Sequence, residues 1–329
     1  MTPTRILVTG GAGFIGSHYV RTLLGPDGPG NVSVTVLDAL TYAGNPANLD
    51  EVRDHPGLAF VHGDICDAEL VGRLTAGHDQ VVHFAAESHV DRSIDGGAAF
   101  VRTNVTGTHT LVHAAHEAGV GTFVHVSTDE VYGSIDEGSW TEDEPLAPNS
   151  PYSASKASSD LIALAYHRTH GLDVRVTRCS NNYGHHHFPE KVIPLFVTNL
   201  LEGLPVPLYG DGAHVRDWLH IDDHVQGIEL VRTQGRPGEV YNIGGGTELS
   251  NKELTRLLLE ACDADWDTDV IHVEDRKGHD RRYSVDCTKI REELGYAPRK
   301  DFSAGLAETV RWYRENRSWW EPLKERAAL

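Results

Sequence analysis

Tyr152 and Lys156 have the residue types and the spacing of an acid–base pair. Ser150 suits an N-cap, Pro151 suits a first helical position and Gly171 marks a helix end, so both side chains fall on one face of a helix. A tyrosine acts as a base only if its pKa falls from about 10 toward neutrality, which requires about 4 kcal/mol. One ammonium group about 4 Å away supplies roughly that amount at an effective dielectric constant of about 20. The pair therefore predicts a tyrosine that acts as a base, although burial of the phenolate works against its ionisation.

A run of three residues upstream, Thr128-Asp129-Glu130, combines a hydroxyl group with two carboxyl groups. The hydroxyl can complete a site built on Tyr152 and Lys156. A reaction that removes a carbon-bound proton and expels water needs one base and one acid, which two carboxyl groups supply. Neighbouring side chains of a regular strand point to opposite faces, so this hypothesis requires the chain to bend after Thr128. The alternative is a solvated strand end in a chain rich in acidic residues.

A glycine-rich turn near the N-terminus, Gly11-x-Gly13-x-x-Gly16, has the pattern of a dinucleotide-binding site. Glycine at these positions allows a tight turn, close approach of the backbone to a pyrophosphate, and close packing of the helix that follows. Asp38 ends the second predicted strand, 22 residues after Gly16. A carboxylate there accepts hydrogen bonds from an adenosine ribose and repels a 2′-phosphate, which favours NAD over NADP. The alternative is a glycine turn with a capping aspartate. An oxidised nicotinamide would add a second positive charge beside the tyrosine.

These residues lie on a regular alternation of short β-branched runs and helical patterns over the first 180 residues. Helical patterns such as Phe14–Leu24 and Phe100–Ala118 fill the gaps. This alternation predicts an α/β fold with a doubly wound parallel Rossmann sheet. The predicted strands are Arg5–Thr9, Val32–Leu37, Leu58–His62, Gln80–Phe84, Thr122–Ser127 and Asp173–Thr177.

The pattern loosens after about residue 178 into loops and shorter helices at Pro189–Glu202, Asn251–Cys262 and Phe302–Trp320. Ile221–Thr233 is again helical and Glu239–Ile243 again strand-like, so this pair could rejoin the first sheet. We therefore expect a smaller, discontinuous α/β domain for the substrate. The predicted division is 1–178 plus about 217–246 for the dinucleotide, and about 179–216 plus 247–329 for the substrate.

Composition narrows the class of protein. The chain has 329 residues, 40% hydrophobic and 23% charged, as is ordinary for a globular protein. A net charge of −19 argues against nucleic acid or an anionic membrane as the main partner. No apolar run reaches the ~18 residues of a membrane span, and the N-terminus has no signal-peptide core, so we expect a cytoplasmic protein. The four cysteines lack a CxxC motif and are interpreted as reduced structural thiols.

Seven motifs follow one another along essentially the whole chain: Thr41–Asn45, Ala85–Ser93, Thr128–Glu130, Ser180–Gly184, His187–Lys191, Arg216–Trp218 and His279–Tyr283. Together they resemble the dTDP-glucose 4,6-dehydratase family of the extended short-chain dehydrogenase/reductase superfamily. UDP-galactose 4-epimerases share the fold and the tyrosine–lysine pair but lack the Asp-Glu pair, and GDP-mannose dehydratases keep the Glu without the Asp.

The resemblance implies NAD-dependent dehydration of dTDP-glucose to dTDP-4-keto-6-deoxyglucose, a lyase reaction. The steps are oxidation at C4, elimination of water across C5 and C6, and return of hydride to C6. By resemblance, Tyr152 with Lys156 removes the proton of the C4 hydroxyl, which Thr128 orients. Glu130 takes the C5 proton, and Asp129 protonates the departing C6 hydroxyl, so its pKa is expected to lie well above about 3.9.

The resemblance also implies two sets of binding residues. Those expected to bind NAD are Gly10, Gly13, Phe14, Ile15, Gly16, Asp38, Thr41, Asp64, Ile65, Ala85, Ala86, Tyr152, Lys156 and Asn181. Those expected to bind dTDP-glucose are Ser88, His89, Thr128, Asn181, Glu190, Lys191, Pro207, Tyr209, Arg216, Asn251, Arg276 and His279. Arg216 suits a bidentate contact with a diphosphate, and the alternative is an internal ion pair with Asp217.

Other interpretations stay open from sequence. The protein could be a nucleotide-sugar 4-epimerase, a dehydratase for another nucleotide sugar, or a non-catalytic NAD-sensing regulator.

Three histidines follow one another at His185–His187. The first two stand where relatives usually have a Pro-Tyr pair. Adjacent residues in a strand or helix do not converge on one ion, so we expect no metal and a loop on the substrate side. A homodimer through Phe100–Ala118 and Tyr152–His170 is the family expectation, although their apolar residues could equally be core.

Overall fold

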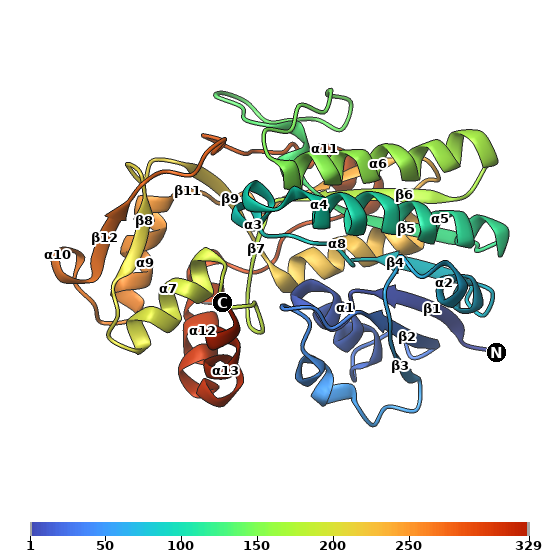
Figure 1. Ribbon diagram of the computed structural model, residues 1–329, viewed down its shortest axis with the longest axis horizontal. Coiled ribbons are helices and arrows are strands. Elements are labelled where there is room, and N and C mark those ends of the chain that lie inside the picture. Colours follow the sequence, from blue (N-terminus) through green and yellow to red (C-terminus); the bar gives the residue numbers. More distant parts are fainter. Residues whose placement is uncertain (1, 328–329) are drawn as a thin grey trace.

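In the computed structural model, which describes residues 2–327, a seven-stranded parallel sheet forms the centre of the larger part of the molecule (Figure 1). Its strand order is β10-β6-β5-β4-β1-β2-β3, so the order reverses between β1 and β4 as in doubly wound folds. The predicted fold class is confirmed. The strands are β1 (Thr4–Thr9), β2 (Val32–Asp38), β3 (Leu58–His62), β4 (Gln80–His83), β5 (Thr122–Thr128), β6 (Val174–Cys179) and β10 (Val240–Ile243).

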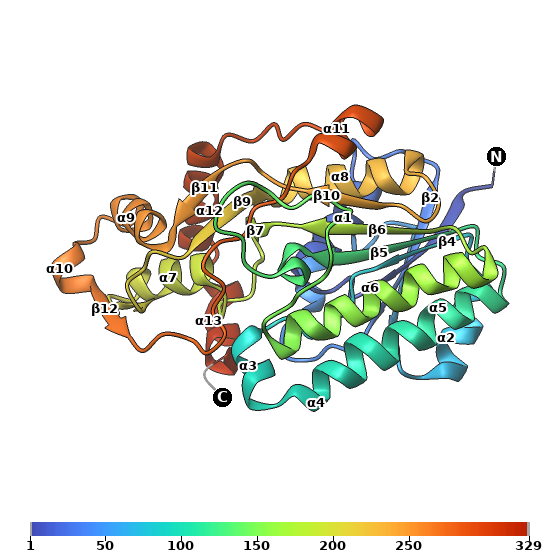
Figure 2. The same cartoon turned by 90° about the horizontal axis from the view of Figure 1, so that it is seen from above.

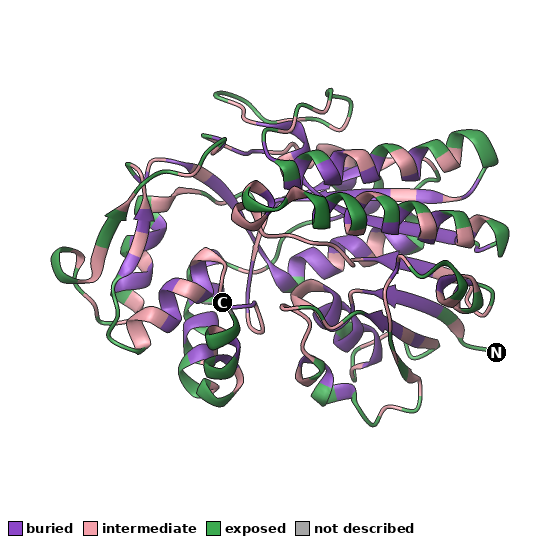
Figure 3. Ribbon diagram, viewed as in Figure 1, coloured by how far each residue is buried: buried purple, intermediate pink, exposed green. Residues whose placement is uncertain are grey.

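Helices cover both faces of this sheet (Figure 2). On one face the core lies between the strands and α2, α5 and α6, and on the other between the strands and α1, η1, α8 and α11. The central strands are buried, and exposed residues gather on the outer sides of the helices (Figure 3). These elements are α1 (Phe14–Leu24), η1 (Pro46–Val52), α2 (Ala68–Thr75), α5 (Thr108–Glu117), α6 (Pro151–His170), α8 (Ile221–Gln234) and α11 (Thr288–Leu294). None of the helices that the structure describes is long and apolar enough to cross a membrane.

The predicted helix Phe100–Ala118 is wrong in detail. The chain forms α3 (Val90–Asp95), α4 (Gly97–Phe100) and a π-helical segment η2 (Val101–Gly107) before α5. Inside η2, the Asn104 side chain accepts from the Glu87 amide at 2.8 Å and donates to the Glu87 carbonyl at 2.9 Å. It also donates to the Ser155 hydroxyl at 2.8 Å. These tertiary contacts brace the loop after β4 against α6 and lie outside what helical periodicity can predict.

The rest of the chain forms a smaller part with a third hydrophobic core. The predicted helix Pro189–Glu202 begins later, at Val192, and the predicted helix Phe302–Trp320 is two helices separated by Asn316. The small sheets have the orders β11-β9-β7 and β12-β8. The elements are β7 (Asn181–Tyr183), α7 (Val192–Leu201), β8 (Val206–Tyr209), β9 (Val215–His220), β11 (Glu248–Ser250), α9 (Asn251–Ala261), α10 (Trp266–Asp269), β12 (Val270–Val273), α12 (Phe302–Glu315) and α13 (Arg317–Ala327).

Candidate active site

One large cleft, with a volume of about 1070 Å³, lies at the carboxyl ends of the central strands, where doubly wound sheets bind their ligands. It is larger than the ~300–1000 Å³ of most small-molecule sites, which leaves room for two ligands. Every residue that the sequence analysis assigned to NAD, substrate or catalysis lines this cleft. The structure thus brings all of the predicted residues together, while their individual roles stay predictions.

The glycine turn is shaped for a dinucleotide phosphate. Gly10 has φ +70°, and a Cβ at that position would lie 2.6 Å from the backbone nitrogen of Ala85. A Cβ at Gly16 would lie 2.3 Å from the Gly10 carbonyl oxygen, so α1 packs directly on the turn. Gly13 is the N-cap of α1 and offers no side-chain cap, which leaves amide groups of the first helical turn open to an anion in the cleft. Turn and cleft therefore fit the dinucleotide that the sequence predicts.

Asp38 holds this turn in place. Its carboxylate accepts from the Ala12 amide at 2.8 Å and from the Leu40 amide at 2.8 Å. Burial raises the pKa of Asp38, and these two hydrogen bonds oppose the rise. Asp38 therefore caps the turn, as the alternative interpretation of the sequence expected, and it also lines the cleft. At the neighbouring strand end, Asp64 pairs with Arg102 at 2.7 Å.

The chain bends after β5, as the two-carboxyl hypothesis requires. Asp129 begins the 3₁₀ helix η3 (Asp129–Tyr132), and the Glu130 amide lies 3.3 Å from the Thr128 hydroxyl, which accepts from it. The Thr128 hydroxyl also donates to Asp129 Oδ1 at 3.3 Å. All three side chains and Tyr152 line the same cleft, so the bend turns both carboxyl groups toward the tyrosine side of the site.

The environments of the two carboxyl groups differ. Asp129 is 2% exposed and its Oδ2 has no partner. Burial, then the charges of Glu130 and Asp217, raise the pKa of Asp129 well above its ordinary value. Burial also raises the pKa of Glu130, but three cations, Lys191, Arg216 and Arg276, oppose that rise. The surroundings thus favour the protonated form of Asp129 more strongly than that of Glu130, which is how one acid and one base can arise from two carboxyl groups.

The helix signals around the tyrosine–lysine pair are confirmed. Ser150 caps α6 in a reciprocal capping box with Ser153, and Gly171 ends the helix at φ +73°. Lys156 is buried and donates through Nζ to the Val126 carbonyl at 2.8 Å. This contact ties the face of α6 that carries the pair to β5.

The tyrosine is more strongly buried than the sequence argument assumed. Burial, then nearby Glu130, Cys179 and Asp129, raise the pKa of Tyr152 well above 10, and only a hydrogen bond with Thr128 opposes the rise. The direction of this shift opposes ionisation of Tyr152, so the positive charge of an oxidised nicotinamide would favour the phenolate.

Arg216 forms no ion pair with Asp217, the next residue in the sequence. Its Nη2 donates to the Asp280 carbonyl at 3.0 Å, and the guanidinium lies 4.3 Å from the centre of the Tyr283 ring. Asp217 instead accepts from the amides of Gly245 and Thr247 at 2.9 and 2.8 Å. The internal ion pair is therefore wrong, and Arg216 faces the cleft without a carboxylate partner among the described residues.

Three supporting residues of the substrate side were missed by sequence reasoning. Tyr283 lies under Arg216, Arg92 pairs with Glu190 at 3.3 Å, and Asp91 pairs with Arg276 at 2.6 Å. Arg92 and Tyr283 stand inside motifs that the sequence analysis quoted, but their partners lie far away in the chain, so no spacing rule identifies the pairs.

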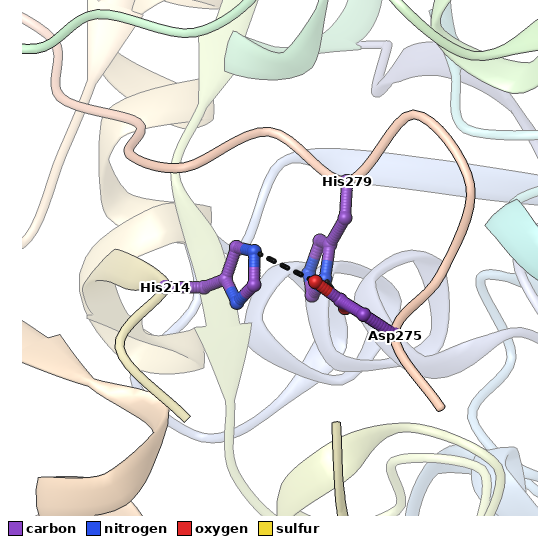
Figure 4. A group of neighbouring side chains, drawn as sticks. All are labelled: His214, Asp275 and His279. Carbon is purple, nitrogen blue, oxygen red and sulfur yellow. Dashed lines mark hydrogen bonds and ion pairs between the residues drawn. The ribbon is translucent and has the colours of Figure 1, made fainter. Parts of the chain in front are cut away.

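His279 is supported by Asp275 and His214 (Figure 4). The His279 Nδ1 lies 2.7 Å from one oxygen of Asp275, and the His214 Nε2 lies 3.4 Å from the other. The two imidazole rings stack, with centroids 3.7 Å apart and planes 14° apart. The Asp275 carboxylate accepts a hydrogen bond from His279 and forms an ion-pair contact with His214, and the two rings lie stacked. We therefore interpret the cluster as a hydrogen-bonded support for His279 rather than as a metal chelate.

The expectation for the histidine run is wrong in part. Only His187 lines the cleft, where it stacks on Phe14 with centroids 4.1 Å apart. His186 packs on Trp312 at 4.4 Å, away from the substrate side, and His185 packs on His18 at 5.2 Å. Burial lowers the pKa of His187 to about 3 and that of His186 to about 2, so these rings are neutral packing groups.

Comparison with known proteins agrees with this geometry. The model of the family described as GDP-mannose 4,6 dehydratase matches residues 7–309. The chain is 68% identical over 326 residues to the dTDP-glucose 4,6-dehydratase of Streptomyces griseus, covering 99% of each chain. A crystal structure of dTDP-glucose 4,6-dehydratase from Streptomyces venezuelae with NAD bound has a TM-score of 0.95 at 66% identity, covering 97% of this chain and 100% of that one. A UDP-glucose 4-epimerase from Thermotoga maritima has a TM-score of 0.88 at 33% identity, covering 95% and 100%.

Proposed function

This chain belongs to the GDP-mannose 4,6-dehydratase family, and on that premise we propose that it catalyses the NAD-dependent dehydration of dTDP-glucose to dTDP-4-keto-6-deoxyglucose. Relatives at 61–68% identity carry the name dTDP-glucose 4,6-dehydratase, whereas the epimerase resembles the chain at 33%. The observation that carries the proposal is the contrast between Asp129 and Glu130. A 4-epimerase reaction expels no water and has no use for a buried carboxyl group that favours its protonated form beside a second carboxyl group.

NAD fits the half of the cleft that the glycine turn, Asp38 and the ends of β1 and β4 enclose. When bound, it supplies the redox chemistry, accepting hydride from the sugar and returning it. The turn holds the pyrophosphate at the N-terminus of α1, and Asp38 accepts hydrogen bonds from the adenosine ribose. The further residues proposed to line this half are Thr41, Asp64, Ile65, Ala85, Ala86 and Asn181.

The protons are divided among four side chains. The Tyr152 phenolate removes the proton of the C4 hydroxyl, and the Thr128 hydroxyl orients that group. Glu130 takes the proton from C5, which becomes acidic once C4 is a ketone. Asp129 donates its proton to the C6 hydroxyl, so that water leaves. Glu130 then returns its proton to C5.

The nucleotide is held by the cations that also oppose the rise of the Glu130 pKa. Arg216 presents its guanidinium to the diphosphate, and Lys191 and Arg276 complete a positive wall. Lys191 donates to the Ser88 carbonyl at 2.7 Å, so this wall is joined to the loop that borders the glucose. Tyr209, close to Arg276, offers a ring for stacking on the base, with the guanidinium 5.3 Å from its centre. The other proposed contacts are His89, Glu190, Pro207, Asn251 and His279.

We propose that residues 1–178 and about 217–246 form the NAD-binding unit and the remainder the nucleotide-sugar unit. Pairing of β10 with β6 supports the return of the chain to the large sheet. The boundary near residue 217 lies within β9, which pairs with β7 and β11 outside that sheet.

We also propose a cytoplasmic location. The free state of all four cysteines supports a reducing compartment such as the cytoplasm.

A homodimer through η2, α5 and α6 is the proposed assembly. Val101 and Leu161 on this face are each 55% exposed, which is unusual for large apolar side chains. Leu161→Glu should convert a dimer to a monomer in light-scattering measurements. Leu204→Glu is the matched control, because Leu204 is 47% exposed in the other part of the molecule. A monomeric wild type would contradict the proposal.

The activity is tested by mass spectrometry of dTDP-glucose incubated with the purified protein in D₂O without added reductant. Loss of one water with one solvent deuterium at C5 is the expected result. An unchanged mass with inversion at C4 would indicate an epimerase. If the protein does not convert dTDP-glucose but converts a UDP- or GDP-sugar, the proposed mechanism stands and the assignment of thymine as the nucleobase is wrong.

A further inference from the structure

Trp319, on the C-terminal helix α13, reaches the loop that supports the glycine turn. Its indole Nε1 donates to Asn48 Oδ1 at 3.0 Å. Asn48 lies in η1, is 2% exposed, and donates through Nδ2 to the Ala12 carbonyl at 2.9 Å. Ala12 stands between two glycines of the turn, Gly11 and Gly13. Two hydrogen bonds in series therefore join the last helix of the chain to the turn near its beginning.

The Ala12 peptide group is held from both sides. Its amide donates to Asp38, and its carbonyl oxygen also accepts from the Asn45 amide at 3.0 Å. These bonds fix the backbone of Ala12 just before α1, whose first residues, Phe14 and Ile15, line the cleft. Any loosening of Asn48 thus acts on the backbone that meets the pyrophosphate.

The hydrogen bond from the Trp319 indole fixes the orientation of the Asn48 side-chain amide. The amide is buried, with Nδ2 on Ala12 and Oδ1 on Trp319. Without the indole N–H, Oδ1 becomes a buried acceptor with no partner, which favours rotation of the amide away from the turn. The Trp319 ring is itself fixed, since it packs on Trp312 at 5.0 Å and on His186 at 5.3 Å.

We propose that Trp319 is a positioning residue that slows the release of NAD by locking Asn48 onto the glycine turn. It touches neither NAD nor substrate and acts through Asn48 alone. The inference rests on the proposed function, because it takes NAD as the occupant of the turn. It also gives a role to His186, whose ring fills the space beside Trp319.

The test compares the rate of NAD release from Trp319→Phe and Trp320→Phe, measured with an excess of an NAD-consuming enzyme as a trap. Trp320 is the matched control, because it follows Trp319 in α13 but its indole donates to the Tyr313 carbonyl of α12 at 2.7 Å and not to Asn48. Loss of one neutral hydrogen bond corresponds to a factor of about 5 in rate. Trp319→Phe should release NAD about 5-fold faster and retain less NAD through gel filtration, while Trp320→Phe should release it at the wild-type rate.

A second comparison shows whether the effect passes through Asn48. In an Asn48→Ala background, Trp319→Phe should add no further acceleration. Equal release rates for Trp319→Phe and wild type, equal acceleration by Trp320→Phe, or additive effects in the double variant would each overturn the inference. If the wild type retains NAD and dehydrates dTDP-glucose, such a result leaves the proposed function intact. A wild type that binds no NAD would overturn both.

Discussion

Asp129→Asn is the substitution that separates the two halves of the proposed reaction. The amide keeps the shape of the side chain and the contact with the Thr128 hydroxyl but has no proton to give the departing C6 hydroxyl. A general acid contributes about 10²–10⁴ in rate, which equals about 3–5 kcal/mol of the barrier to elimination. Because the Asp129 carboxyl is buried and favours its neutral form, the neutral amide should change folding stability by less than about 1 kcal/mol.

The assay is rapid mixing with dTDP-glucose, followed through the absorbance of the reduced nicotinamide. In the wild type that signal should be transient. In Asp129→Asn it should rise at a near wild-type rate and persist, because oxidation at C4 proceeds while water loss is slow. Glu130→Gln should show the same accumulation, with loss of solvent deuterium exchange at C5. Accumulation in neither variant would refute the assignment of acid and base.

The pH dependence gives an independent check of the same assignment. Asp129 works only when protonated, so elimination should slow as the pH rises through its raised pKa. Asp217 contributes to that raised pKa through its negative charge, and Asp217→Asn should therefore move this decline to lower pH. An unchanged or upward-moving decline would mean that another group limits the rate at high pH. Because the carboxyl groups interact, the observed pKa values belong to the pair.

Three further outcomes follow from the structure. Arg216→Ala should raise the KM for dTDP-glucose about 30–150-fold, the equivalent of about 2–3 kcal/mol, and Arg216→Lys should recover part of this loss. An unchanged KM in steady-state kinetics would mean that Arg216 does not bind the diphosphate. Gly16→Ala should abolish NAD retention in gel filtration, because its Cβ would meet the Gly10 carbonyl at 2.3 Å, and normal NAD content would contradict the tight packing of the turn. Asp160→Asn should lower the free energy of unfolding in urea by about 3–5 kcal/mol, because it leaves Arg178, now 2.9 Å away, buried without its partner. Burial raises the pKa of Asp160, but the hydrogen bond with His125 and the charge of Arg178 lower it more, to about 2. The ionised carboxylate therefore stabilises the fold above pH ~4, and this stabilisation is lost as the pH falls toward 2. A difference in unfolding free energy between wild type and Asp160→Asn that persists at pH 2 would contradict this assignment.

Elements whose signals are local were predicted well from the sequence. Phe14–Leu24 is helical over the predicted residues, and the helix of Tyr152 begins and ends at the residues that its caps indicate. The strands of the large sheet agree within one or two residues, because apolar β-branched runs between turn signals leave little choice. The failures lie where tertiary contacts decide. The π-helical segment follows the bonds of Asn104, and the helix break at Asn316 lies within a cluster of tryptophans brought together by packing.

The same limit applies inside the site. The spacing of Asp129 and Glu130 predicts one acid and one base but does not say which is which, and the family resemblance alone assigned the acid to Asp129. The answer comes from residues distant in sequence: Asp217 raises the pKa of Asp129, while Lys191, Arg216 and Arg276 oppose protonation of Glu130.

The cations that oppose protonation of Glu130 are also the proposed ligands of the substrate diphosphate. A bound diphosphate would neutralise part of their charge, so Glu130 becomes a stronger base when the nucleotide is in place. In the free enzyme these cations limit the rise of the Glu130 pKa, and substrate binding should raise its proton affinity further. Difference infrared spectra of the carboxylate band should show this rise when dTDP is added to wild type, and a smaller rise in Arg216→Ala, because Lys191 and Arg276 remain. An unchanged Glu130 pKa on saturation with dTDP would mean that the cation wall serves binding alone.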